Sequence, residues 1–162
     1  MQRRLILMRH AKSSWKDAEL EDHERPLNKR GRKSAPKVAV RLVELGWVPE
    51  RVLSSDSVRT RQTWELMAGH FVPPPEVEFR SDLYHGSVDE VETILREFDP
   101  AVRTVLLLGH NPGWEAVAEW LTERDLEVKT GAALLLEARG DTWSEPGPGG
   151  WRLEEAVNPK EL

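Results

Sequence analysis

The stretch Leu5-Ile6-Leu7-Met8-Arg9-His10-Ala11 decides the fold of this chain. Four apolar residues run without interruption into an arginine and a histidine, and such a run is typical of a strand buried on both faces. A second apolar run, residues 104–108, ends in Gly109-His110. Ligands of open α/β sheets bind at the carboxyl ends of the parallel strands. We therefore expect both strands to bring a histidine to the same edge of one sheet.

The composition is that of an ordinary globular protein. Of the 162 residues, 39% are hydrophobic and 31% are charged, and the length suits a single domain over residues 1–162. The net charge of −5 gives no general reason to expect nucleic-acid binding. No segment has the roughly 20 apolar residues of a membrane helix. The chain contains no cysteine and no signal-peptide pattern, so we expect it to be cytoplasmic.

The rest of the chain alternates between strand and helix patterns. Strands are expected at 3–9, 51–54, 77–79, 104–108, 132–136 and 151–157, the last two flanking a Gly/Pro-rich loop at 140–150. Helices are expected after Asn28, after Ser55 or Asp56, after Ser87 and after Asn111. This order predicts a three-layer α/β/α sandwich with a mostly parallel mixed sheet.

Two helices and one loop have features that the pattern leaves open. Pro36 either kinks the first helix or follows a fresh start capped by Ser34. The second helix is expected to turn Val58, Gln62, Leu66 and His70 inward. Residues 11–27 form a long polar loop, and loops of this length are often functional. Trp15 within it either packs beneath a solvated lid or contributes to partner specificity.

Charged residues follow three of the predicted strands. His10 has a side chain that can attack phosphorus, and the neighbouring Arg9 can bind phosphate oxygens. Arg59 lies in the first turn of a helix, where a cation is unfavourable unless an anion binds beside it. His110 also lies between a strand and a helix. Each feature has a structural alternative: a salt bridge for Arg9, pairing of Arg59 with Asp56 or Glu65, and backbone hydrogen bonds for the histidines.

Four blocks in order give the chain a family resemblance. They are Arg9-His10-Ala11-Lys12-Ser13-Ser14-Trp15, Arg25-Pro26-Leu27-Asn28-(x2)-Gly31, Ser55-(x3)-Arg59-(x2)-Gln62-Thr63 and Gly109-His110-Asn111-Pro112. Together they resemble the histidine phosphatase superfamily, which has the phosphoglycerate mutase-like fold. Within it they are most similar to the SixA-like branch of small bacterial phosphohistidine phosphatases.

The resemblance implies a role for each site residue. His10 is the nucleophile that becomes phosphorylated, Arg9, Arg59 and Arg25 bind the phosphoryl group, and His110 steadies the charge of the transition state. Ser55 belongs to the third block, as a phosphate-site residue or only as a helix cap. The implied reaction needs no metal or other cofactor. The implied partner is a phosphorylated protein, such as a phosphotransfer domain, or a small phosphorylated molecule, with no nucleic acid and no membrane.

One departure from the superfamily bears on the substrate. Many members place a carboxylate after the third strand as general acid, and here residues 82–87 offer only Asp82 and His85, both of which also suit a turn. Imidazole leaves phosphorus more easily than an alkoxide does, so the missing acid favours phosphohistidine as substrate. The alternatives are a small-molecule phosphomonoesterase of the same fold and a non-catalytic phosphate- or phosphopeptide-binding module. Convergence of His10, His85 and His110 on a metal is disfavoured by the neighbouring arginines.

Overall fold

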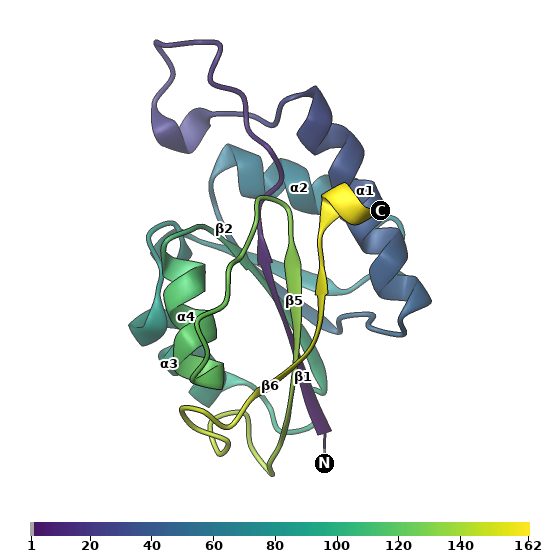
Figure 1. Cartoon of the computed structure of the whole chain (residues 1–162), viewed down its shortest axis with the longest axis vertical. Coiled ribbons are helices and arrows are strands. Elements are labelled where there is room, and N and C mark those ends of the chain that lie inside the picture. The colour runs from purple at the N-terminus through teal and green to yellow at the C-terminus, as the bar shows by residue number, and fades with distance from the viewer. Residues whose placement is uncertain (1) are drawn as a thin grey trace.

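The computed structural model describes residues 2–162 and has the expected order of strands and helices (Figure 1). The strands are β1 (Gln2–Arg9), β2 (Arg51–Ser55), β3 (Glu76–Arg80), β4 (Thr104–Gly109), β5 (Ala133–Arg139) and β6 (Arg152–Val157). The α-helices are α1 (Lys29–Glu44), α2 (Val58–Ala68), α3 (Val88–Glu97) and α4 (Gly113–Thr122). Three short 3-10 turns are η1 (Asp22–Glu24), η2 (Ser81–Leu83) and η3 (Pro159–Glu161).

The six strands form one mixed sheet in the order β3-β2-β4-β1-β5-β6. The first four strands of this order are parallel, whereas β5 pairs antiparallel with both β1 and β6. The registers place Arg9 of β1 opposite Gly109 of β4. The residues that follow these two strands, His10 and His110, are therefore neighbours at one edge of the sheet. This confirms the predicted fold class.

Helices cover both faces of the sheet, and β1 contributes side chains to both cores. Leu5 and Leu7 pack with residues of α3 and α4, whereas Ile6 and Met8 pack with residues of α1 and α2. Figure 1 shows the two helix pairs on opposite sides of the strands. This alternation explains why the run at 5–8 is apolar throughout, since neither face of the central strand meets water.

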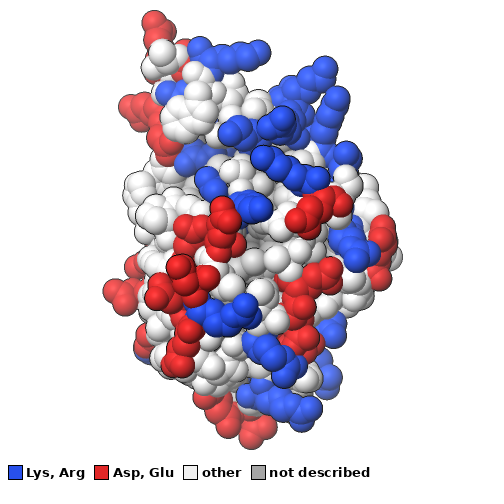
Figure 2. Space-filling model, in the orientation of Figure 1, with Lys and Arg blue, Asp and Glu red and all other residues white. Residues whose placement is uncertain are grey.

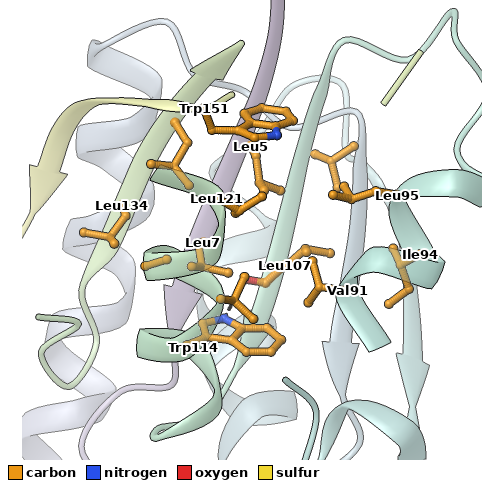
Figure 3. Close-up of a cluster of buried hydrophobic side chains, with 14 of the residues drawn as sticks. Leu5, Leu7, Val91, Ile94, Leu95, Leu107, Trp114, Leu121, Leu134 and Trp151 are labelled. Carbon is orange, nitrogen blue, oxygen red and sulfur yellow. Dashed lines mark hydrogen bonds between the residues drawn. The ribbon is translucent and has the colours of Figure 1, made fainter. Parts of the chain in front are cut away.

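Trp114 anchors the core on the α3 and α4 side (Figure 3). Its side chain is fully buried, and its indole N–H donates to the Leu107 carbonyl at 3.3 Å. A Cβ on Gly109 would lie 2.6 Å from the Trp114 ring, so glycine is required where β4 ends. Close packing of α4 on β4 thereby determines where His110 leaves the sheet.

The structure corrects the predicted details of two helices. Ser57, rather than Ser55 or Asp56, caps α2 by accepting a hydrogen bond from the Thr60 amide. The buried residues of α2 are Arg59, Thr60, Thr63, Trp64 and Met67, and His70 is exposed beyond the end of the helix. The predicted inward face was wrong in part. Leu66 does pack against the core, but the first turns of α2 bury polar residues beside the sheet edge, which apolar periodicity does not reveal.

Smaller details are also settled by the structure. α1 continues through Pro36, without a second start at Ser34. The capping box of Ser87 and Glu90 is present at α3. α4 begins at Gly113 with Pro112 at the N-cap, so Asn111 lies outside the helix. None of the helices formed by residues 2–162 combines the length and apolar character that crossing a bilayer needs.

Candidate active site

A cavity of about 340 Å³ opens where β1 and β4 end, beside the first turn of α2. Most of its wall is polar. The lining residues are Arg9, His10, Lys12, Ser13, Trp15, Asp22, Arg59, Tyr84, His85, His110, Asn111 and Thr130. Four of the residues singled out in the sequence, namely Arg9, His10, Arg59 and His110, therefore meet in one cavity at the carboxyl edge of the sheet.

His10 is buried, and its hydrogen bonds define its reactive atom. Its Nδ1 lies 2.7 Å from the Ala11 carbonyl oxygen, which can only accept, so Nδ1 carries the ring proton. Nε2 is then unprotonated, and its lone pair accepts a hydrogen bond from Arg59 Nε at 3.4 Å. Burial, with the positive charges of Arg59 and Arg9, lowers the pKa of His10 to about 4. The ring is therefore neutral at pH 7, with Nε2 available as a nucleophile.

The backbone after His10 is held by residues of the second and third sequence blocks. The Ala11 amide donates to Thr63 Oγ1 of α2 at 3.1 Å. The Lys12 carbonyl accepts from the Asn28 amide at 2.9 Å. Gly31 of α1 lies against the same carbonyl, and a Cβ there would approach its oxygen to 2.2 Å. These contacts explain why a threonine on α2 and a glycine on α1 accompany the arginine–histidine pair.

Arg59 contacts an acidic residue of the long loop, rather than Asp56 or Glu65. One terminal nitrogen donates to the Asp22 backbone carbonyl at 2.6 Å, and the other donates to Asp22 Oδ2 at 3.0 Å. The Tyr84 hydroxyl donates to the same carboxylate oxygen. Partial burial would raise the pKa of Asp22, but the hydrogen bonds from Tyr84 and Arg59 outweigh it, and the pKa is lowered. Asp22 is therefore ionised at neutral pH.

His110 faces His10, with ring centroids 5.1 Å apart. Its Nε2 lies 2.8 Å from Ser55 Oγ, and that oxygen already accepts from the Ser57 amide. The Ser55 hydroxyl is thus free to donate to Nε2, which places the His110 proton on Nδ1. Nδ1 is buried and has no hydrogen-bond partner among residues 2–162. Burial, followed by the neighbouring His10 and Arg59, lowers the pKa of His110 to about 3.

Ser55 and Arg9 take different positions around these histidines. Ser55 is fully buried behind His110, so it acts as a positioning residue for that ring rather than as a helix cap. Arg9 is half-buried in the cavity wall and donates to the Val128 carbonyl at 3.3 Å. Its Nε is buried without a partner. Burial lowers the pKa of Arg9, and its guanidinium keeps donors available at the cavity.

The structure does not bring Arg25 to the cavity wall. Its terminal nitrogens donate to the backbone carbonyls of Asp17 and Leu20 at 2.9 and 3.0 Å. Its guanidinium lies 4.1 Å from the centre of the Trp15 ring, which is 61% exposed rather than packed beneath a lid. Arg25 therefore gives two carbonyls of its own loop a side-chain donor. Arg25 thus stabilises the loop that carries Asp22.

The two candidate general acids also differ in position. The Asp82 carboxylate is exposed and accepts two hydrogen bonds from Arg80, at 3.0 and 2.8 Å, away from the cavity. The hydrogen bonds from Arg80 lower the pKa of Asp82, so it is a poor proton donor at neutral pH. His85 is exposed at the cavity rim, with its ring 4.3 Å from that of Tyr84. Among residues 2–162, no three His, Cys, Asp or Glu side chains are grouped to hold a metal ion.

Sequence reasoning missed Asp22 and Tyr84, which also belong to the cavity. Tyr84 lies edge-on to the His110 ring at 5.4 Å and bonds to Asp22, so it links the loop to the second histidine. The only available signal for Asp22 was its place in a long polar loop. Several other acidic residues share that loop, so the pattern could not single it out.

A neutral, buried histidine beside guanidinium donors at the edge of an α/β sheet is an arrangement that can support phosphoryl transfer. The comparisons with known proteins give the family. The histidine phosphatase superfamily (branch 1) matches residues 5–97. The chain belongs to this superfamily, and it is a phosphatase of the SixA-like type.

Individual relatives agree with this family. An uncharacterised chloroplast protein of Arabidopsis thaliana is 41% identical over 172 residues, covering 97% of this chain and 78% of its own length. A protein from Agrobacterium tumefaciens assigned as the phosphohistidine phosphatase SixA has a TM-score of 0.83 at 26% identity, covering 97% and 98% of the two chains. A protein histidine phosphatase SixA complexed with tungstate has a TM-score of 0.84 at 25% identity, covering 100% and 99%.

Proposed function

We propose that this phosphatase hydrolyses phosphohistidine on a protein through a covalent phosphate on His10. One observation carries the proposal: His10 Nε2 is an unprotonated nucleophile held beside Arg59 in a cavity that has no carboxylic acid poised to donate a proton. The similarity to SixA structures, one of them bound to the tetrahedral oxyanion tungstate, supports the same chemistry.

In the first step, His10 Nε2 attacks the phosphorus atom of the substrate. The new N–P bond forms as the bond to the substrate imidazole breaks, and that electron pair stays on the leaving ring nitrogen. The His10 ring becomes positively charged, and its Nδ1–H continues to donate to the Ala11 carbonyl. Donors from Arg9, Arg59 and His110 meet the charge on the phosphoryl oxygens.

In the second step, water attacks the phosphorus of phospho-His10. The P–O bond forms as the N–P bond breaks, and the electron pair returns to Nε2. Both water protons leave on the product as dihydrogen phosphate, which restores the neutral ring. Because the pKa of His10 is depressed to about 4, the freed Nε2 stays unprotonated and is ready for another cycle.

The electrostatics of the cavity favour an N–P bond over an O–P bond. Asp22, the carboxylate in the cavity, is ionised and already accepts hydrogen bonds from Tyr84 and Arg59. An alkoxide leaves poorly without a proton donor. The phosphorylated imidazole of a substrate can take its proton from solvent on the far nitrogen, and it then leaves as neutral imidazole with a pKa near 6.5. Phosphohistidine therefore suits this site better than a phosphate ester.

Trapping experiments test the nucleophile directly. The enzyme is mixed briefly with ³²P-labelled phosphoramidate, quenched and split between acid and alkali. We expect label that is lost in acid and retained in alkali, and that is absent from His10→Ala. His70→Ala is the matched control, since His70 is an exposed histidine away from the cavity. Acid-stable label, or label that persists in His10→Ala, would contradict the proposal.

The ester-hydrolysing alternative rests on His85, because its side chain lies at the cavity rim. Were His85 a proton donor, the enzyme would hydrolyse simple phosphate esters faster than phosphoramidate, and His85→Ala would lose the ester activity selectively. We expect the reverse preference and a small effect of His85→Ala. A parallel assay of the two substrates with both proteins decides between the functions.

A further inference from the structure

Six of the chain's seven lysines line a single groove beside the catalytic cavity. The groove has a volume of about 1010 Å³ and is formed by the loop after β1, the exposed side of α1, the segment before β5 and η3. The six are Lys12, Lys29, Lys33, Lys37, Lys129 and Lys160, and Arg9 and Arg30 line it too, against two acidic residues, Glu127 and Glu161. In Figure 2, Lys and Arg side chains gather on the upper part of the molecule, where Figure 1 shows the first turns of α1.

The side-chain ammonium groups of these lysines pair with no carboxylate among residues 2–162. All six are exposed, and every ion pair found within residues 2–162 has an arginine or a histidine as its cation, never a lysine. Lys29, Lys33 and Lys37 are spaced four apart on α1, where like charges repel each other. The first turn of α1 contains no acidic residue, although the helix dipole favours one there. An anionic partner would turn this unfavourable arrangement into a favourable one.

The groove is continuous with the catalytic cavity. Arg9, Lys12 and Thr130 line both, so a ligand in the groove reaches the wall that holds His10. From Lys29 to Lys37, the lysines extend for about 12 Å along the helix. The catalytic cavity alone is large enough to bind a single phosphoryl group. The groove therefore serves the part of the substrate that surrounds the phosphate.

We propose that the groove binds an acidic protein surface next to the phosphorylated histidine of the substrate. Lysine is a flexible, strongly hydrated point charge, which suits contact with scattered carboxylates, whereas bidentate recognition of a second phosphate would favour arginine forks. Pockets for small molecules hold a few placed polar groups, whereas eight of the fourteen residues that line this open groove are Lys or Arg. On a chain with net charge −5, it also orients an acidic partner toward His10.

This inference deepens the proposed function and rests on it, so its test measures both separately. The substrates are phosphoramidate, a peptide with one phosphohistidine flanked by Asp and Glu, and the same peptide with Asn and Gln instead. We expect the wild type to prefer the acidic peptide by about tenfold in kcat/KM at low salt. The preference should shrink as ionic strength rises above 0.1 M, where the Debye length is about 10 Å.

The decisive variant is Lys29→Glu/Lys33→Glu/Lys37→Glu. Glutamate is a good helix former, and at position 29 it also lies in the first turn, where a negative charge is favourable, so α1 is expected to remain folded, which circular dichroism checks. We expect this variant to lose the preference for the acidic peptide relative to phosphoramidate. The matched control reverses three exposed arginines outside the groove and should keep the preference: Arg103→Glu/Arg124→Glu/Arg139→Glu.

The outcomes separate the two proposals. Equal rates on both phosphopeptides, or a preference for the acidic peptide that persists in the lysine variant, would overturn the proposal that the groove binds an acidic surface. Either result would leave the proposed phosphatase function intact. The proposal is also overturned if the wild type binds a single-stranded RNA instead of the acidic peptide and the lysine variant does not bind that RNA. Failure to hydrolyse phosphoramidate and both phosphopeptides overturns the proposed function. In that case, fluorescence anisotropy with the unphosphorylated acidic peptide tests the groove, and equal binding by wild type and lysine variant rejects it.

Discussion

Acidification should destabilise this protein because its two cavity histidines resist protonation when folded. The pKa values of His10 and His110 are about 4 and about 3, whereas both histidines have pKa values near 6.5 in the unfolded chain. Between these limits the unfolded chain binds more protons than the folded one. Stability is therefore fully present above pH 6.5 and falls as the pH drops toward the folded-state values.

The size of the effect follows from these values. At pH 5 each histidine is almost fully protonated in the unfolded chain and almost fully neutral in the cavity. Between pH 7 and pH 5, each then lowers the free energy of unfolding by about 2 kcal/mol, and the pair lowers it by about 4 kcal/mol. This loss is a large part of the stability of a typical domain.

Urea unfolding at pH 7 and pH 5 measures the loss, and the variant His10→Gln/His110→Gln isolates it. The comparison removes the pH dependence that the wild type and the variant share. We expect the wild type to lose about 4 kcal/mol more than the variant between the two pH values. A difference below about 1 kcal/mol, close to the error of extrapolation, would refute the claim that burial holds both rings neutral.

Three further predictions concern the residues around the nucleophile. Gly31→Ala should lower the free energy of unfolding by about 1–3 kcal/mol and reduce kcat, because the new Cβ would lie 2.2 Å from the Lys12 carbonyl oxygen. Urea unfolding measures the stability, and phosphoramidate hydrolysis measures kcat. Asp22→Asn should strengthen binding of inorganic phosphate by about two- to fivefold in calorimetry, since it removes a half-exposed carboxylate that occupies Arg59. The profile of kcat/KM against pH should stay flat from pH 8 to about 5, and fall below that as His10 Nε2 is protonated, after correction for substrate ionisation.

Matched variants make these predictions specific. Gly69→Ala has nothing within 4 Å of its Cβ and should leave stability almost unchanged. Glu21→Gln removes an exposed carboxylate beside Asp22 and should leave phosphate affinity unchanged. Weaker phosphate binding by Asp22→Asn would mean that the carboxylate positions Arg59 rather than competing with phosphate for it. A rate that already falls near pH 6.5 would contradict the low pKa of His10.

The sequence by itself determined the fold class and the four residues that meet in the cavity. Uninterrupted apolar runs at 5–8 and 105–108 predict strands buried on both faces, because a central strand meets no water. Parallel strands end at a common sheet edge, so the polar residues after them were expected together. Local patterns suffice for the fold, since burial and strand direction follow from short segments of chain, whereas the four site residues were joined by the order of the sequence blocks.

Only the tertiary structure decided which side chains from distant segments touch. Asp22 reaches Arg59 across 37 residues, and Ser55 reaches His110 across 55. Arg25, expected at the phosphate, instead bonds the carbonyls of its own loop. The path of a long loop is set by where its backbone groups find partners, and no periodicity in the sequence encodes those partners. For the same reason, lysines scattered from residue 12 to residue 160 became one groove only when the chain folded.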